Sequence, residues 1–138
     1  MRSRRGRWIK IGSLLLAFAG LGACIAPILN VPPPGAMQIS FESQAILDAD
    51  GGGRTVWTTR GGPLPQAALA TYYVRNKTLE AGVFAPARDD GSFTARDMDG
   101  TAGDPIQIYY VTPAGDYSES ICVLLMPGAA SLASLCPP

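Results

Sequence analysis

The stretch Ile106-Gln107-Ile108-Tyr109-Tyr110-Val111 has the composition and the alternation of a β-strand. β-Branched and aromatic residues suit a pleated, half-buried surface, and successive side chains of a strand point to opposite faces. We therefore expect Ile106, Ile108 and Tyr110 to face the core together. In the segment that ends at Arg75, the arginine should face water, so Tyr72 and Val74 should face the core.

Short apolar stretches of this kind recur from Met37 onward, separated by turn residues such as those at 48–53 and 61–65. The segment 121–126 is apolar on both faces, which predicts a central strand. A single helical candidate, 66–70, is too short to be stable without tertiary support. The pattern predicts an all-β sandwich of about seven strands within residues 37–126, followed by a C-terminal tail at 127–138. The expected strands are 38–42, 55–59, 69–74, 83–85, 93–95, 106–112 and 117–126.

The first 23 residues differ in character from the rest. Five of the eleven basic residues lie within the first ten positions, and the run from Ile11 to Ala23 carries no charge. A basic start followed by a short apolar run predicts a helical secretory signal. An uncleaved membrane anchor is the alternative, because the uncharged stretch from Ile11 to Leu29 is about long enough to span a bilayer.

The apolar run ends in Leu21-Gly22-Ala23-Cys24, which resembles the lipobox of bacterial lipoproteins. The resemblance implies a lipoprotein signal peptide at 1–23, with palmitate and other acyl chains on Cys24. It also implies a protein that is anchored to a membrane of the cell envelope and faces the periplasm or the exterior. In that family an Asp after the cysteine retains the protein in the inner membrane; Ile25 stands there, which favours the outer membrane.

Residues 24–36 contain three consecutive prolines, Pro32 to Pro34, which favour an extended, stiff conformation. The segment is therefore expected to be a tether that holds the domain off the membrane. The alternative is an ordered first strand along the edge of the domain, where proline is also tolerated.

The turns of the second half have a recognisable order: Asp90-Gly91-Ser92-Phe93, then Gly103-Asp104-Pro105, then Ala114-Gly115-Asp116-Tyr117. This order resembles bacterial immunoglobulin-like domains, and Gly62-Pro63-Leu64-Pro65 is similar to carboxypeptidase regulatory-like domains. Both families are β-sandwiches, so the resemblance implies an immunoglobulin-like sandwich. It covers residues 61–125 and implies a fold rather than an activity.

The chain has three cysteines. If Cys24 carries lipid, Cys122 and Cys136 remain in an oxidising compartment, where an even number of cysteines favours a disulfide. Such a bridge would hold the tail against the last strand. The alternative is that Cys122 is a small buried apolar residue and that the tail is loose.

The composition argues against several classes of function. The chain has no histidine, which excludes the Ser-His-Asp and Cys-His arrangements and the usual zinc sites. Residues 24–138 carry six basic and eleven acidic side chains, a net charge of −5, which argues against nucleic-acid binding. We expect no enzyme activity, no cofactor and no nucleic-acid partner.

The carboxylates are the one ionisable cluster that could bind a metal ion or act as an acid–base pair. Asp97, Asp99 and Asp104 are weak candidates for a calcium site or a carboxylate pair, but no EF-hand spacing is present. Because Asp-Gly pairs are ordinary turn residues, we expect no metal site.

The sequence leaves the molecular function open between two main readings. The first is a lipid-anchored β-sandwich of the cell envelope with a structural or protein-interaction role. The second is a carbohydrate- or peptide-binding module of the envelope. An aromatic patch exposed on one sheet face would favour the second reading, and a uniformly polar surface would oppose it. The aromatic candidates are Trp57, Tyr72, Tyr73, Tyr109, Tyr110 and Tyr117. The partner is expected to be an envelope protein or a polysaccharide.

Overall fold

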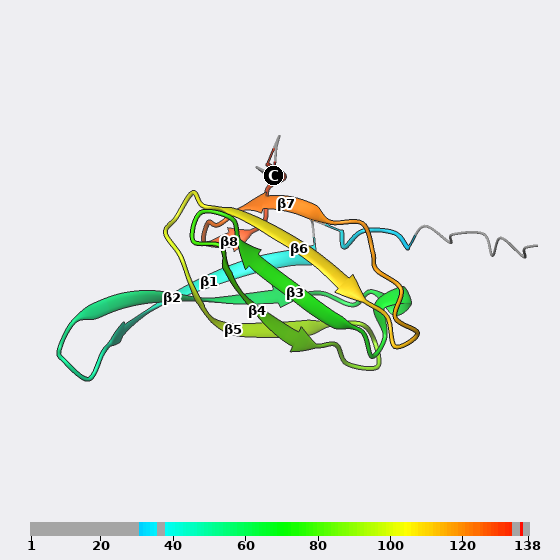
Figure 1. Cartoon of the computed structure of the whole chain (residues 1–138), viewed down its shortest axis with the longest axis horizontal. Helices are drawn as coiled ribbons and strands as arrows, with labels where there is room; N and C mark the ends of the chain where they lie inside the picture. The colour runs from blue at the N-terminus through cyan, green and yellow to red at the C-terminus, as the bar shows by residue number, and fades with distance from the viewer. Residues whose placement is uncertain (1–30, 36–37, 134–135, 137–138) are drawn as a thin grey trace, which may run out of the picture.

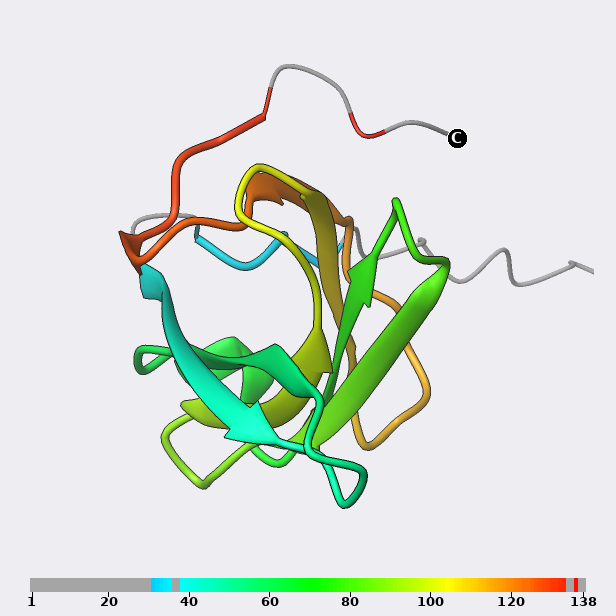
Figure 2. The same cartoon turned by 90° about the vertical axis from the view of Figure 1, so that its left-hand side faces the viewer.

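The computed structural model describes residues 31–35, 38–133 and 136, and these form a sandwich of two four-stranded antiparallel sheets (Figures 1 and 2). The first sheet has the order β5-β2-β1-β8 and the second the order β4-β3-β6-β7. The all-β sandwich expected from the strand pattern is confirmed. In chain order the strands are β1 Ile39–Leu47, β2 Gly53–Gly61, β3 Thr71–Asn76, β4 Ala81–Pro86, β5 Phe93–Asp99, β6 Pro105–Val111, β7 Ile121–Leu124 and β8 Gly128–Ala129.

The core lies between the sheets, and the strands face it as their alternation predicts. In β6, Ile106, Ile108 and Tyr110 are fully buried, and in β3 Tyr72 and Val74 are 1% exposed, so both predictions are confirmed. The Tyr72 ring stacks on Phe93 with centroids 3.9 Å apart, and its hydroxyl donates to Gly91 O at 3.3 Å. Burial raises the pKa of the Tyr72 hydroxyl well above its ordinary value.

Strand β7 is an edge strand of the second sheet, so the prediction of a central strand at 121–126 is wrong. Its inward side chain Val123 is fully buried, while Cys122 and Leu124 on the other face are half-buried. The C-terminal segment returns beside this strand: Leu124 N–H donates to Ser131 O, and Val123 forms a bridge with Leu132. On the outer face, Cys122 is bonded to Cys136 of the same segment, so an apolar outer face here accompanies contact with the C-terminal segment and not a central position.

The expected helix at 66–70 is a single 3-10 turn, η2 (Pro65–Ala67). The strand predicted from Leu69 begins two residues later, at Thr71, because Leu69 adopts a positive φ of 58° that a strand does not allow. Leu69 is 63% exposed, whereas its neighbours Ala67 and Ala70 lie in the core.

The β1–β2 hairpin projects beyond one end of the sandwich, toward the left in Figure 1 and toward the viewer in Figure 2. Strand β1 is buried at Ile39 and Phe41 but exposed from Glu42 to Ala45, and Leu47 at the tip is 82% exposed. We call residues 43–55 of this hairpin the arm. The β3–β4 turn and the β5–β6 loop lie at the same end of the molecule (Figure 1).

Residues 128–133 of the C-terminal segment pair with strands of both sheets. Strand β8 pairs with Ser40 and Phe41 of β1, after which residues 131–133 return to β7. A disulfide joins Cys122 to Cys136, with Cα atoms 5.3 Å apart, which is the pairing that the cysteine count favours. The segment thus connects the free edges of the two sheets.

Residues 31–34 lie against the body, as in the alternative of an ordered first strand. Val31 forms a parallel bridge with Ser118, and Pro34 is almost fully buried. The Tyr110 hydroxyl donates to Pro32 O at 2.8 Å. The predicted signal helix, the lipobox cysteine Cys24 and the first residues of the expected tether lie outside the described residues.

Within the described ranges, no helix has the length and apolarity needed to cross a bilayer.

Candidate functional site

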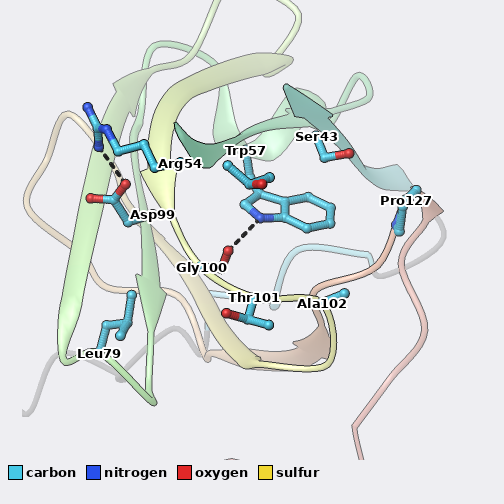
Figure 3. Close-up of a pocket in the computed structure, with 10 residues that line it drawn as sticks. Ser43, Arg54, Trp57, Leu79, Asp99, Gly100, Thr101, Ala102 and Pro127 are labelled. Atoms are coloured by element: carbon cyan, nitrogen blue, oxygen red, sulfur yellow. Dashed lines mark hydrogen bonds and ion pairs between the residues drawn. The ribbon is translucent and has the colours of Figure 1, made fainter. Parts of the chain in front are cut away.

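A cleft of about 530 Å³ opens at the end of the sandwich from which the arm projects (Figure 3). Its lining includes Ser43 and Arg54 of the arm, Leu79 of the β3–β4 turn, and Pro127, which precedes β8 and lies near Ser43 in Figure 3. The cleft continues the space between the two sheets beyond the point where core side chains fill it. Such open ends of sandwiches and barrels are common ligand sites.

The floor of the cleft is the Trp57 indole, which is 3% exposed. Its Nε1–H donates to Gly100 O at 2.9 Å, as the dashed line in Figure 3 shows. Because this donor is already used, the indole offers the cleft an apolar surface rather than a hydrogen bond.

Arg54 lies between two carboxylates at the rim of the cleft. Its Nε donates to Asp48 Oδ1 at 2.9 Å, and its Nη1 donates to Asp99 Oδ1 at 2.6 Å. Hydrogen bonds to Asp48 and Asp99 raise the pKa of Arg54, so the guanidinium stays charged. The three side chains are all about half exposed, so both pairs contribute little to stability. The pair with Asp99 links the arm to β5, whereas the pair with Asp48 lies within the arm.

A buried polar network shapes the wall formed by the β3–β4 turn and the β5–β6 loop. The Asn76 amide, which is fully buried, donates to Asp104 Oδ2 at 2.7 Å and to Asp99 O at 3.2 Å. Its oxygen accepts from the N–H groups of Thr78 and Leu79. Desolvation opposes the ionisation of Asp104. Hydrogen bonds from Thr101, Asn76 and Thr78 outweigh it and lower the pKa of Asp104.

The weak metal candidates do not form a ligand set. Asp104 is engaged with Asn76, and Asp99 pairs with Arg54. Asp97 occupies a bulge, where it and Arg96 together face the single residue Thr58 of β2, and its φ is 61°. In the part of the chain that the structure describes, no group of three metal-ligating side chains is present.

Aromatic side chains form a row across the outer face of the second sheet. We call Phe84, Tyr73, Tyr109 and Tyr117 the aromatic row. Ring centroids are 6.4 Å apart for Phe84–Tyr73, 5.0 Å for Tyr73–Tyr109 and 6.2 Å for Tyr109–Tyr117. Phe84 and Tyr117, at its ends, are 73% and 70% exposed. The row exists because β3 pairs Tyr73 with Phe84 on one side and with Tyr109 on the other.

The six aromatic candidates therefore divide between the core and the surface. Trp57, Tyr72 and Tyr110 are buried, whereas Tyr73, Tyr109 and Tyr117 lie on the outer face. Sequence reasoning missed Phe84, although Val83 and Ala85 around it are the inward residues of a strand. An outward Phe between two inward apolar residues was the available signal.

A shallow hollow of about 220 Å³ lies beside the row. Phe84 and Tyr73 line it together with Arg75 and Gly82. Arg75 is paired with Glu80, so the surroundings of the row are nearly neutral. A ligand that carries an apolar group fits this surface better than a charged one.

Comparison with known protein families, curated protein sequences and solved structures finds no match to this chain.

Proposed function

We propose that the protein is a lipid-anchored interaction module of the cell envelope that contacts a protein partner through the aromatic row. The observation that carries the proposal is the row itself: Phe84, Tyr73, Tyr109 and Tyr117 on the outer face of one sheet, with both ends largely exposed. Aromatic residues are enriched in protein interfaces because a rigid ring contributes a large contact area at a small cost in entropy.

The geometry of the row favours a polypeptide over a sugar. The Tyr73 and Tyr109 rings are stacked with their planes 7° apart, so the faces that they turn toward each other are covered. Edges and hydroxyl groups remain, and these suit apolar side chains and backbone groups. A sugar ring stacks on an open aromatic face, which only the ends of the row offer. A polysaccharide is the second candidate because Phe84 and Tyr117 are such ends.

The membrane anchor is the other half of the proposal, and the lipobox residues 21–24 support it. Seven residues lead from Cys24 to Val31, which docks on the body. At about 3.5 Å per residue, that segment reaches at most ~25 Å, so the sandwich would stay close to the bilayer.

Replacement of Cys24 with Ser tests the anchor. The unaltered protein should have a mass equal to residues 24–138 plus acyl chains and should partition into detergent. The C24S variant should keep residues 1–23 and should lack acyl mass. A native mass without acyl chains would contradict the anchor and leave the aromatic row untouched.

Site-specific photo-crosslinking tests the row. A photoreactive phenylalanine analogue at position 84 or 117 should give a discrete protein adduct in intact cells, and the same analogue at exposed Leu69 should not. Adding Tyr73→Ser to the position-117 probe should weaken that adduct. Purified peptidoglycan sacculi serve as the polysaccharide probe: cosedimentation that is lost with Phe84→Ser, without any protein adduct, would replace the protein partner with a glycan.

A further inference from the structure

The β1 strand has an open edge along the arm. Strand β8 covers this edge only at Ser40 and Phe41. Beyond Phe41 the edge has no partner from β8, because the chain there is Pro127, which comes from β7 of the other sheet. From Ser43 to Leu47, β1 pairs with β2 alone within the described residues.

The backbone of the arm shows which groups are open. Gln38 O accepts from Gly62 next to β2, whereas Ile39 O accepts from Ala130 next to β8. Because N–H and C=O directions alternate along an antiparallel strand, the odd-numbered residues face the β8 edge. Ser43, Ala45 and Leu47 therefore direct their N–H and C=O groups toward the open side, a ready template for one more strand.

The usual protections of an edge strand are missing here. The sequence Ser43-Gln44-Ala45-Ile46-Leu47 contains no charge and no proline, and it pairs with β2 without a bulge. Two of the other edges are protected. Residues 131–133 accompany β7, and Pro86 ends β4. A long, uncharged open edge in a folded domain marks a site of strand addition.

The cleft lies directly beside this edge. Ser43 lines it from the arm, and Pro127 lines it from the start of β8 (Figure 3). A strand added to β1 beyond Phe41 would continue the line of β8 across the mouth of the cleft. Alternate side chains of that strand would point inward, over the apolar Trp57 indole and Leu79. Backbone pairing would give affinity, and the cleft would select the inward side chain.

The charges around the edge indicate the sign of the occupant. Three carboxylates, Asp48, Asp50 and Asp99, belong to the arm and the described cleft lining, where Arg54 is the one cation. The surplus is negative, so a segment with a Lys or Arg near the arm tip is complementary. A second copy of this chain is less suitable, because antiparallel pairing of two β1 edges about Ala45 would place Glu42 opposite Asp48.

We propose that the open β1 edge, Ser43–Leu47, binds an extended basic segment of another protein by β-strand addition, with one apolar side chain of that segment in the cleft over Trp57. This site is separate from the aromatic row and does not depend on it.

The test uses a phage-displayed library of 12-residue peptides selected against the full chain. The enriched peptides should alternate apolar and polar residues and carry Lys or Arg. Synthetic copies of them should bind the chain more weakly as salt rises. A peptide of this kind should also slow amide hydrogen exchange at Ser43, Ala45 and Leu47. Gln44 and Ile46, which already bond to β2, should change little.

Ala45→Pro is the decisive variant, because it removes an N–H from the open edge and no bond to β2. It should weaken peptide binding at least tenfold, whereas the matched Ala45→Ser, which keeps the N–H, should not. Phe84→Ser should leave this binding unchanged and so separates it from the aromatic row. Equal binding to Ala45→Pro, or exchange protection elsewhere, would overturn the proposal. So would a dimer of the full chain that Ala45→Pro dissociates, since the occupant would then be a second copy.

Discussion

Loss of the Cys122–Cys136 disulfide should release the segment that joins the two sheet edges before it affects the rest of the sandwich. The bridge closes a loop of 14 residues that contains all of β8. Loop entropy gives such a bridge about 3 kcal/mol of stability. With a urea m-value of about 1.5 kcal/mol/M, the unfolding midpoint should fall by about 2 M.

The double variant C122S/C136S is the perturbation, and urea unfolding with native-state hydrogen exchange is the assay. Without the bridge, few backbone bonds hold the segment, among them Ala130 N–H to Ile39 O and Ala133 N–H to Cys122 O. Amides of residues 130 and 133 should therefore exchange fastest in the variant. Amides of Ile106 and Ile108, in the core of β6, exchange through global unfolding, so their protection should fall only by the loss in global stability.

Two results would refute this reasoning. Unchanged protection at Ala130 would mean that β8 is held by its pairing with β1 and not by the bridge. Simultaneous opening of Ala130 and Ile108 at the same free energy would mean that the segment and the core form one cooperative unit. The single variants C122S and C136S are the control, since each should match the double variant.

Three further changes have defined outcomes. In Gly61→Ala, the new Cβ would lie 2.1 Å from Phe93 Cε1, so the free energy of unfolding should fall by about 1–3 kcal/mol. The control is Gly53→Ala on the same strand, where the nearest atoms to a new Cβ are 4.0 Å away. Thermal or urea unfolding should show a loss of stability for the control that is less than half of the loss for Gly61→Ala. The folded-state pKa of Asp104 is lowered below its ordinary 3.8, so its contribution to stability is present above that value and is lost as pH falls through the folded pKa. The free energy of unfolding of Asp104→Asn should therefore depend less on pH below about pH 4 than that of the parent protein. The same pH dependence in both proteins in that range would contradict this. Millimolar calcium should leave the melting temperature within about one degree, because Asp97, Asp99 and Asp104 do not form a ligand set; a rise of several degrees that a chelator reverses would reveal a missed site.

Side-chain alternation was sufficient to predict the core where the two faces of a strand differ. Ile106, Ile108 and Tyr110 follow the period of two, and burial of three large side chains leaves one register for β6. The cysteine pairing was also accessible, because counting needs no geometry. In each case a local rule and the tertiary structure point the same way.

Alternation was insufficient where both faces of a strand are apolar. Alternation places Tyr72 and Tyr110 in the core and therefore their neighbours Tyr73 and Tyr109 on the outer face. It does not show that Phe84 and Tyr117 extend these two rings into one row, because that depends on how the strands pair. The outer face of β7 is apolar although β7 lies at the sheet edge, because the chain turns back beside it within about ten residues, and the sequence pattern does not show that return. The bulge at Asp97 and the positive φ at Leu69 depend on packing and leave no signal in residue type.

The docking of residues 31–34 has a mechanical consequence. Among the described residues, a pull on the amino-terminal side of the chain reaches Val31, Pro32 and Pro34 before any load falls on β1. If these contacts give way, the chain from Val31 to Ile39 adds at most about 28 Å of extension at ~3.5 Å per residue. The segment would then lengthen under tension while the two sheets stay folded. If the proposed anchor and the proposed partner both hold the domain, such slack would absorb the movement of one relative to the other.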